Sequence, residues 1–279
     1  MSVTEATTAS HRNQGGSAPR RPGRGGSTSG RTGGGGNSIA ILSVITVLVA
    51  WEFVPRLLKV DTFIFPPLSA VLAKLTDGAT LTLLYEHAKV TMYEALVGLA
   101  IGVVLGVAVG FVLAEWSVTR KAVYPFIVAF QSMPKVALAP LFIIWFGFGY
   151  TPKILVVVML VFFPMLVNTM NGILATDPAR LDLFKSLSAS RWQIWRRLLL
   201  PSALPSMFAG LEVAVVNSFI GAITGEFVGA DAGLGVLLQQ FKNAYDTPGV
   251  FAILVILAIV GVLLNQSVRL CRRRLVFWQ

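Results

Sequence analysis

Four polar side chains stand inside long apolar stretches of this sequence, where they could line a path for a polar solute. Asn217 and Glu226 lie in one stretch, and Asn168 and Asn171 lie in another. A polar group among apolar residues needs a partner, which is either another side chain or a ligand. Asn also stabilises helix pairs with no ligand present, and Glu226 could be a hydrogen-bonded partner of another helix or part of a gate. Both interpretations stay open.

Signatures of catalysis are missing from the sequence. There is no G-x-x-x-x-G-K-[ST] phosphate loop, no G-x-S-x-G nucleophile turn and no H-E-x-x-H zinc helix. The lone Cys271 and the separated His11 and His87 argue against a metal cluster. We therefore predict a chain that is not an enzyme and binds no cofactor or metal itself.

The composition is that of a membrane protein. Of the 279 residues, 55% are hydrophobic and 13% are charged, and the mean hydropathy is +0.73. Such a chain is too apolar for a soluble domain and long enough for several membrane-spanning helices. The net charge of +10 resides mostly in tails and loops, so it signals membrane topology and not nucleic-acid binding. The predicted fold class is an all-α membrane protein.

Two regions are expected. Residues 1–37 are rich in Gly, Ser, Thr and Arg and predict a disordered basic tail on the cytoplasmic side, because the positive stretch is too long for a cleaved signal peptide to be favoured. Residues 38–279 form the transmembrane domain, with a surface segment at 63–75 and a loop before the last span. The expected spans are about 39–58, 89–114, 122–147, 153–174, 202–228 and 250–270, with a polar segment at 177–201.

Two of these spans carry glycine at every fourth residue, which predicts close helix packing and says nothing of substrate. The third span contains three prolines and Lys135, so it should be bent or broken, with the charged residue at a cavity or interface. The glycines are Gly98, Gly102, Gly106 and Gly110, then Gly221, Gly225 and Gly229, and the prolines are Pro125, Pro134 and Pro140.

The pattern of the polar segment predicts two short helices joined by small residues. Asp177 is a candidate N-cap for the first helix. Ser190 and Gln193 form a candidate capping box for the second, which Pro201 should end. By these residues alone, the segment could equally be an amphipathic helix pair lying on anionic lipid.

The segment resembles the "EAA" signature of permease subunits of bacterial ABC importers. Asp182 takes the acidic place, Ser188 the glycine place, and Pro201 the end of the closing apolar-x-Leu-Pro run. Leu183 and Phe184 depart from the small residues that the family usually has there. The run SMPKVALAPLFIIWFGFG at 132–149 also resembles permeases of the nitrate, sulfonate and taurine group, which includes carriers of pyrimidine vitamin precursors.

This resemblance implies a type I importer permease that carries a nitrate-, sulfonate- or taurine-type anion, or alternatively a pyrimidine (thiamine-precursor) solute. It implies cytoplasmic ATPases, which hold ATP and Mg, an external substrate-binding protein, and a second permease copy, as a homodimer in the bacterial inner membrane. The implied ATPase-coupling residues are Asp182, Leu183, Phe184, Lys185, Ser188, Ala189, Ser190, Arg191 and Pro201.

The charge distribution supports one orientation. An amino terminus inside places about sixteen of the 23 Lys and Arg residues on the cytoplasmic side, together with the polar segment. A different class remains as the runner-up, an ion-gradient-driven transporter with Glu94, Lys135 and Glu226 as a relay. It would leave the polar segment without a role. A membrane-embedded enzyme would lack a nucleophile or acid-base pair.

Overall fold

The computed structural model of the protein describes residues 35–276. The chain divides into two units, with the boundary between Thr46 and Val47. Helix α1, Gly35–Leu57, begins in the first unit and ends in the second. The predicted tail lies outside the described residues up to residue 34, and α1 begins slightly before the expected boundary at residue 38.

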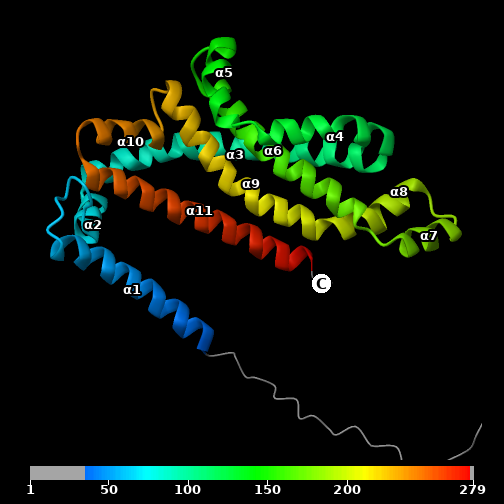
Figure 1. The fold of residues 1–279 in the computed structure, drawn as a ribbon, viewed down its shortest axis with the longest axis horizontal. Helices are drawn as coiled ribbons and strands as arrows, with labels where there is room; N and C mark the ends of the chain where they lie inside the picture. The colour runs from blue at the N-terminus through cyan, green and yellow to red at the C-terminus, as the bar shows by residue number, and fades with distance from the viewer. Residues whose placement is uncertain (1–34, 277–279) are drawn as a thin grey trace, which may run out of the picture. The chain divides into compact units, whose positions relative to one another are not determined.

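All regular structure in the described residues is helical, which confirms the predicted fold class (Figure 1). A single-turn 3₁₀ helix, Lys135–Leu138, precedes α5, and a π-helical segment, Trp195–Leu199, precedes α9. The α-helices after α1 are α2 Leu68–Thr76, α3 Gly78–Glu115, α4 Ser117–Ser132, α5 Ala139–Phe146, α6 Tyr150–Leu174, α7 Pro178–Ser186, α8 Arg191–Ile194, α9 Leu200–Gly229, α10 Leu234–Asn243 and α11 Thr247–Leu275.

Within residues 35–276, four helices are long and apolar enough to cross a membrane, or five if the bent pair α4–α5 is one span. The four are α3, α6, the continuous helix from Arg191 to Gly229, and α11. About six spans were expected, and the first of them falls on α1, which is not in this set, so that span stays a prediction. The surface segment contains only the nine-residue helix α2.

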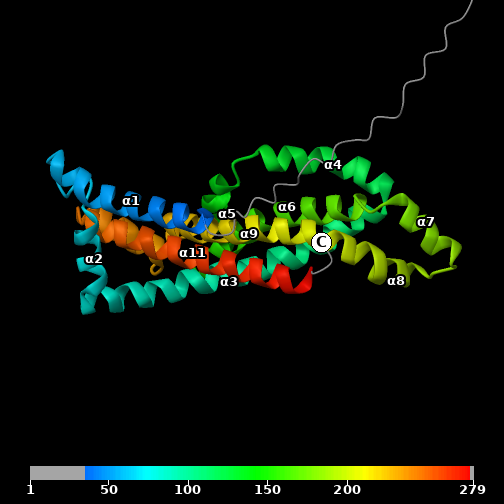
Figure 2. The same cartoon turned by 90° about the horizontal axis from the view of Figure 1, so that it is seen from below.

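Helix α6 packs between α3 and α9 and forms the centre of the second unit (Figures 1 and 2). The glycine stripes face this packing, as predicted, except for Gly229, which lies against Ile143 and Phe148. A Cβ atom added to Gly106 would lie 2.7 Å from the carbonyl oxygen of Phe162, and one at Gly225 would lie 3.0 Å from the Cα atom of Lys153. No side chain fits at those positions, so the glycines allow the helix backbones to approach closely.

The third predicted span is broken, as the prolines indicated. The axes of α4 and of the Lys135–Phe146 stretch differ by 86°. The break follows Pro134, and the ammonium group of Lys135 donates a hydrogen bond of 3.2 Å to the carbonyl of Gln131 and lies over the ring of Phe163. The turn from α5 into α6 has Gly147 and Gly149 with φ of +76° and +122°, which few other residues adopt.

Two expectations about the segments on either side of α9 were wrong. Pro201 does not end the second short helix, because the π-helical segment Trp195–Leu199 carries the chain directly into α9. Pro201 lies in the first turn of α9, and in the wider π turn the amide of Leu200 bonds to the carbonyl of Trp195. The expected loop before the last span contains helix α10.

Helix α3 begins at Gly78, earlier than the expected residue 89. Asp77 caps it by accepting bonds from the hydroxyl (2.6 Å) and the backbone amide (3.0 Å) of Thr80. These bonds stabilise the carboxylate and so lower the pKa of Asp77. This cap marks the start of α3 at Gly78.

Candidate functional site

The predicted caps of the polar segment are present. The carboxylate of Asp177 accepts a hydrogen bond from the amide of Ala179 and begins α7. Ser190 and Gln193 form a complete capping box that begins α8. Each cap satisfies amides at a helix start that would otherwise lack partners, so the two caps determine where α7 and α8 begin.

Ser188 lies at the turn between these two helices with φ of +55°. This left-handed conformation costs a non-glycine residue about 1–2 kcal/mol, and glycine adopts it freely. The position is the one where the resembling signature has glycine. The backbone conformation therefore explains the glycine preference, and Ser188 keeps the turn at some cost.

The surface of α7 and α8 exposes large apolar side chains. Leu183 is 56% exposed, Leu187 is 71% exposed and Trp192 is 62% exposed. Such side chains at a polar surface are typical of an interface with another protein. Of the predicted coupling residues, Asp182, Leu183, Lys185, Ser188, Ser190 and Arg191 are exposed, whereas Phe184, Ala189 and Pro201 are half-buried.

A buried charged cluster, which sequence reasoning did not assemble, lies where α3, α6 and α9 meet. The side chains of Glu94 and Lys153 form an ion pair and are 0% and 5% exposed. Glu226, which is 2% exposed, accepts hydrogen bonds from the hydroxyl of Thr91 (2.6 Å) and the amide of Gly235. Nothing in the sequence singled out Lys153 as the partner of Glu94.

The same cluster holds the chain that follows α9. The hydroxyl of Thr91 accepts a 2.8 Å bond from the amide of Leu234. Nδ1 of His87 lies 2.8 Å from the carbonyl oxygen of Gly233 and 3.1 Å from its amide nitrogen. Gly233 has φ of +132°, and a Cβ there would overlap the carboxylate of Glu226. The cluster therefore ties α3, α6 and α9 to the start of α10.

The four predicted path residues do not gather at one place. Glu226 belongs to the buried cluster. The amide of Asn217 donates a 3.2 Å bond to the carbonyl of Leu160 in α6, and that of Asn168 donates a 2.9 Å bond to Pro164 in its own helix. Asn171 is exposed near the end of α6. Their assignment to a solute path stays a prediction.

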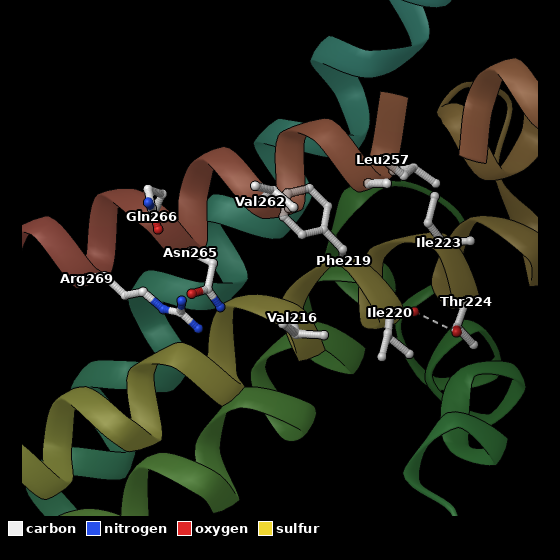
Figure 3. Close-up of a pocket in the computed structure, with 12 residues that line it drawn as sticks. Val216, Phe219, Ile220, Ile223, Thr224, Leu257, Val262, Asn265, Gln266 and Arg269 are labelled. Atoms are coloured by element: carbon white, nitrogen blue, oxygen red, sulfur yellow. Dashed lines mark hydrogen bonds between the residues drawn. The ribbon is translucent and has the colours of Figure 1, made fainter. Parts of the chain in front are cut away.

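A cavity of about 710 Å³ lies between α9 and α11 (Figure 3). Its wall is mostly apolar, with polar groups from Thr224, Asn265, Gln266 and Arg269. The amide of Asn265 has no hydrogen-bond partner among residues 35–276. Concave, largely apolar sites with a few polar groups are the usual form of small-molecule sites. The remaining lining residues are Val216, Phe219, Ile220, Ile223, Leu257, Ala258, Gly261 and Val262.

The one cationic side chain in this wall is not free. Glu212 of α9 pairs with Arg269 at 3.5 Å and with Arg272 at 3.4 Å. The carboxylate offsets much of the positive charge that an anionic ligand would need. Sequence reasoning missed this cavity, because Asn265 and Gln266 lie close to the terminal arginines and read as part of the membrane boundary.

The fold and these sites define a class: a multi-pass helical membrane protein with a capped two-helix segment between its long helices. The family described as "Binding-protein-dependent transport system inner membrane component" matches residues 100–277. The chain belongs to this family and is the permease subunit of an ABC importer. Members of the family work with ATPase and substrate-binding partners.

Individual relatives agree with the family assignment. The formylaminopyrimidine transport permease protein ThiX of Halalkalibacterium halodurans is 34% identical over 85% of this chain and 94% of its own length. The taurine transport system permease protein TauC of Escherichia coli is 30% identical over 86% and 89%. A chain of the MetNI methionine ABC transporter in an inward-facing conformation has the same fold, with a TM-score of 0.65 and 21% identity over 72% of this chain and 99% of its own.

Proposed function

We propose that this permease carries a small, uncharged heterocyclic solute of the pyrimidine type, and that the cavity between α9 and α11 is part of its path. The observation that carries the proposal is the polar lining of that cavity. The unpartnered amide of Asn265 offers both donors and an acceptor, and Phe219 offers an aromatic surface. The cation of Arg269 is offset by Glu212. The name of the relative ThiX fits such a solute.

Energy for transport comes from partner ATPases, which bind ATP and Mg, and this chain performs no catalysis. We place the ATPase contact on α7 and α8, because this surface exposes the large apolar side chains of Leu183, Leu187 and Trp192. A second copy of the permease completes the path. With the amino terminus in the cytoplasm, α7 and α8 lie on the side where the ATPases reach them.

A second candidate is an anionic solute of the sulfonate or taurine type, which the name of TauC suggests. Arg269 and Arg272 favour it, because two guanidinium groups share the single carboxylate of Glu212. An anion that displaced this carboxylate would gain two charge-assisted contacts. For the first candidate, uptake depends on the amide of Asn265. For the second, it depends on the guanidinium of Arg269.

The test is ATP-dependent uptake into vesicles that contain the full permease, its ATPase and its binding protein. Labelled formylaminopyrimidine and labelled taurine are offered separately. We expect uptake of the pyrimidine, and we expect Asn265→Leu to lower it about tenfold, because the solute loses a hydrogen-bonding partner at the site.

The matched control is Asn243→Leu, the same chemical change at an exposed position of α10 outside the cavity. It should leave uptake near the wild-type rate. Uptake of taurine that Arg269→Gln abolishes and Asn265→Leu spares would replace the first candidate by the second. Unchanged uptake in Asn265→Leu would remove the cavity from the path.

A further inference from the structure

A groove with a polar opening lies where α7 and α8 meet the ends of the long helices. It is separate from the proposed solute path. It has a volume of about 790 Å³ and is walled by the last turns of α3 and α6 and by the start of the α8–α9 helix. The lining includes the two tryptophans of this region, Trp192 and Trp195, whose rings stack 4.8 Å apart. Tryptophan at the ends of membrane-spanning helices is typical of the lipid headgroup level.

The mouth of this groove is positively charged. Arg191 and Lys185 line it, against the single carboxylate of Glu115. Within residues 35–276, the guanidinium of Arg191 makes no hydrogen bond or ion pair, and the ammonium group of Lys185 pairs only with the exposed carboxylate of Asp182, at 3.2 Å. The free guanidinium of Arg191 and the neighbouring ammonium group of Lys185 are together suited to bind a phosphate.

An apolar shaft continues from the groove along the long helices. This second cavity, of about 220 Å³, shares Phe111, Ile173 and Trp195 with the groove. It extends further along α3, to Val107, and along α9, to Met207. A soluble anion would use the charged mouth but would have no use for the shaft.

Two hydroxyl groups without partners lie along this route. The Thr176 hydroxyl lines the groove and the Thr169 hydroxyl lines the shaft, and both are buried with no hydrogen-bond partner in the described structure. Thr169 is 0% exposed. A buried hydroxyl that finds no acceptor is costly, so each is poised to donate to an oxygen of a bound molecule.

We propose that the groove and shaft bind one anionic phospholipid from the leaflet next to α7 and α8. Its phosphate lies between Arg191 and Lys185, its ester oxygens accept from the two threonine hydroxyls, and one acyl chain fills the shaft. This leaflet is the cytoplasmic one in the orientation proposed above. The bound lipid packs the two-helix segment against the long helices, so lipid composition affects how motion passes from α7 and α8 to the spans.

The test measures lipid retained by the full permease. The protein is placed in nanodiscs of phosphatidylcholine with phosphatidylglycerol, extracted, and analysed by native mass spectrometry for bound phosphatidylglycerol. We expect the wild type to retain it. Ala108→Phe fills the exposed wall of the shaft and should lower retention about tenfold. Arg191→Gln removes a phosphate contact and should lower it similarly.

The control for the shaft is Ala100→Phe, the same change at an exposed position of α3 that lies outside both cavities. Equal retention by Ala108→Phe and the wild type overturns the proposal. So does equal competition by inorganic phosphate, which would show a site for a soluble anion. If Ala108→Phe fails to fold, Thr169→Val replaces it, and unchanged retention there would also count against the lipid. None of these outcomes depends on the transported solute.

Discussion

Lys153 supplies the positive charge that pairs with the buried carboxylate of Glu94, close to the second carboxylate of Glu226. Burying a charge is costly, and the cost is offset only when its partner is present. The three residues come from three different helices. The cluster therefore depends on the packing of α3, α6 and α9 and at the same time fixes it.

Replacing Lys153 by Met should destabilise the permease by about 3–5 kcal/mol, because it leaves a buried carboxylate without a partner. Unfolding in detergent, followed by circular dichroism, measures the loss. The double variant Lys153→Met with Glu94→Gln should recover part of it, since the unpaired charge is removed.

The matched control is Lys89→Met, which breaks an ion pair with Glu86 whose side chains are 51% and 58% exposed. It should cost about 1 kcal/mol or less, as exposed pairs do. Equal destabilisation by the two lysine variants would show that burial does not decide the effect.

A second residue-scale prediction concerns Ser188, which holds φ of +55° between α7 and α8. Ser188→Gly should stabilise the turn by about 1 kcal/mol, because glycine adopts this conformation without strain. Ser188→Val should do the opposite. Hydrogen exchange of the amides in α7 and α8 measures the effect locally, and faster exchange in the glycine variant would contradict it.

Among the elements, the helices whose features are local in sequence were predicted well. The glycine stripes, the cap at Asp177, the capping box at Ser190 and the break after Pro134 each follow from a few neighbouring residues. Helix α10 was missed, because its short amphipathic stretch is flanked by turn residues. The prediction that Pro201 ends the second short helix was wrong, because a π-helical segment before it carries the chain on into α9.

Sites that join separate helices were predicted less well. Spacing along one helix shows which residues share its face, but not which residue of another helix lies opposite. Asn265 could not be related to Glu212 or Thr224 from the sequence, and the partner of Glu94 could not be identified. The polar segment at 177–201 was located because it is continuous in sequence and resembles a known signature.

The packing of α3 on α6 gives an element-scale prediction. A Cβ at Gly106 would lie 2.7 Å from the carbonyl oxygen of Phe162, which belongs to a helix backbone and has little room to move. Gly106→Ala should therefore destabilise the protein by about 1–3 kcal/mol through overpacking. Thermal unfolding in detergent measures the change.

Its control is Gly261→Ala in α11, where an added Cβ would meet no atom within 4 Å. Alanine should there stabilise the helix by up to about 1 kcal/mol, because it has the higher helix propensity. The two variants make the same chemical change and should differ in sign. The same sign for both would mean that close approach of α3 and α6 does not limit stability.

At the scale of the whole molecule, the proposed function makes α7 and α8 the contact for the ATPases. Ala189 lies half-buried in the turn between the two helices, among exposed residues. Ala189→Glu adds bulk and charge at this surface and should reduce co-purification of the ATPase, while Asn217→Leu should leave it intact. Unchanged association in the Ala189 variant would show that the contact lies elsewhere.

The energy source gives the last test. An ion-gradient mechanism would need Glu94, Lys135 and Glu226 to exchange protons. The structure instead pairs Glu94 with Lys153, bonds Glu226 to Thr91 and Gly235, and places the Lys135 ammonium on the carbonyl of Gln131. These fixed partners favour a structural role over a relay. In vesicles with the ATPase and binding protein, uptake should require ATP and persist when an uncoupler collapses the proton gradient, whereas uptake that follows the gradient without ATP would contradict the importer mechanism.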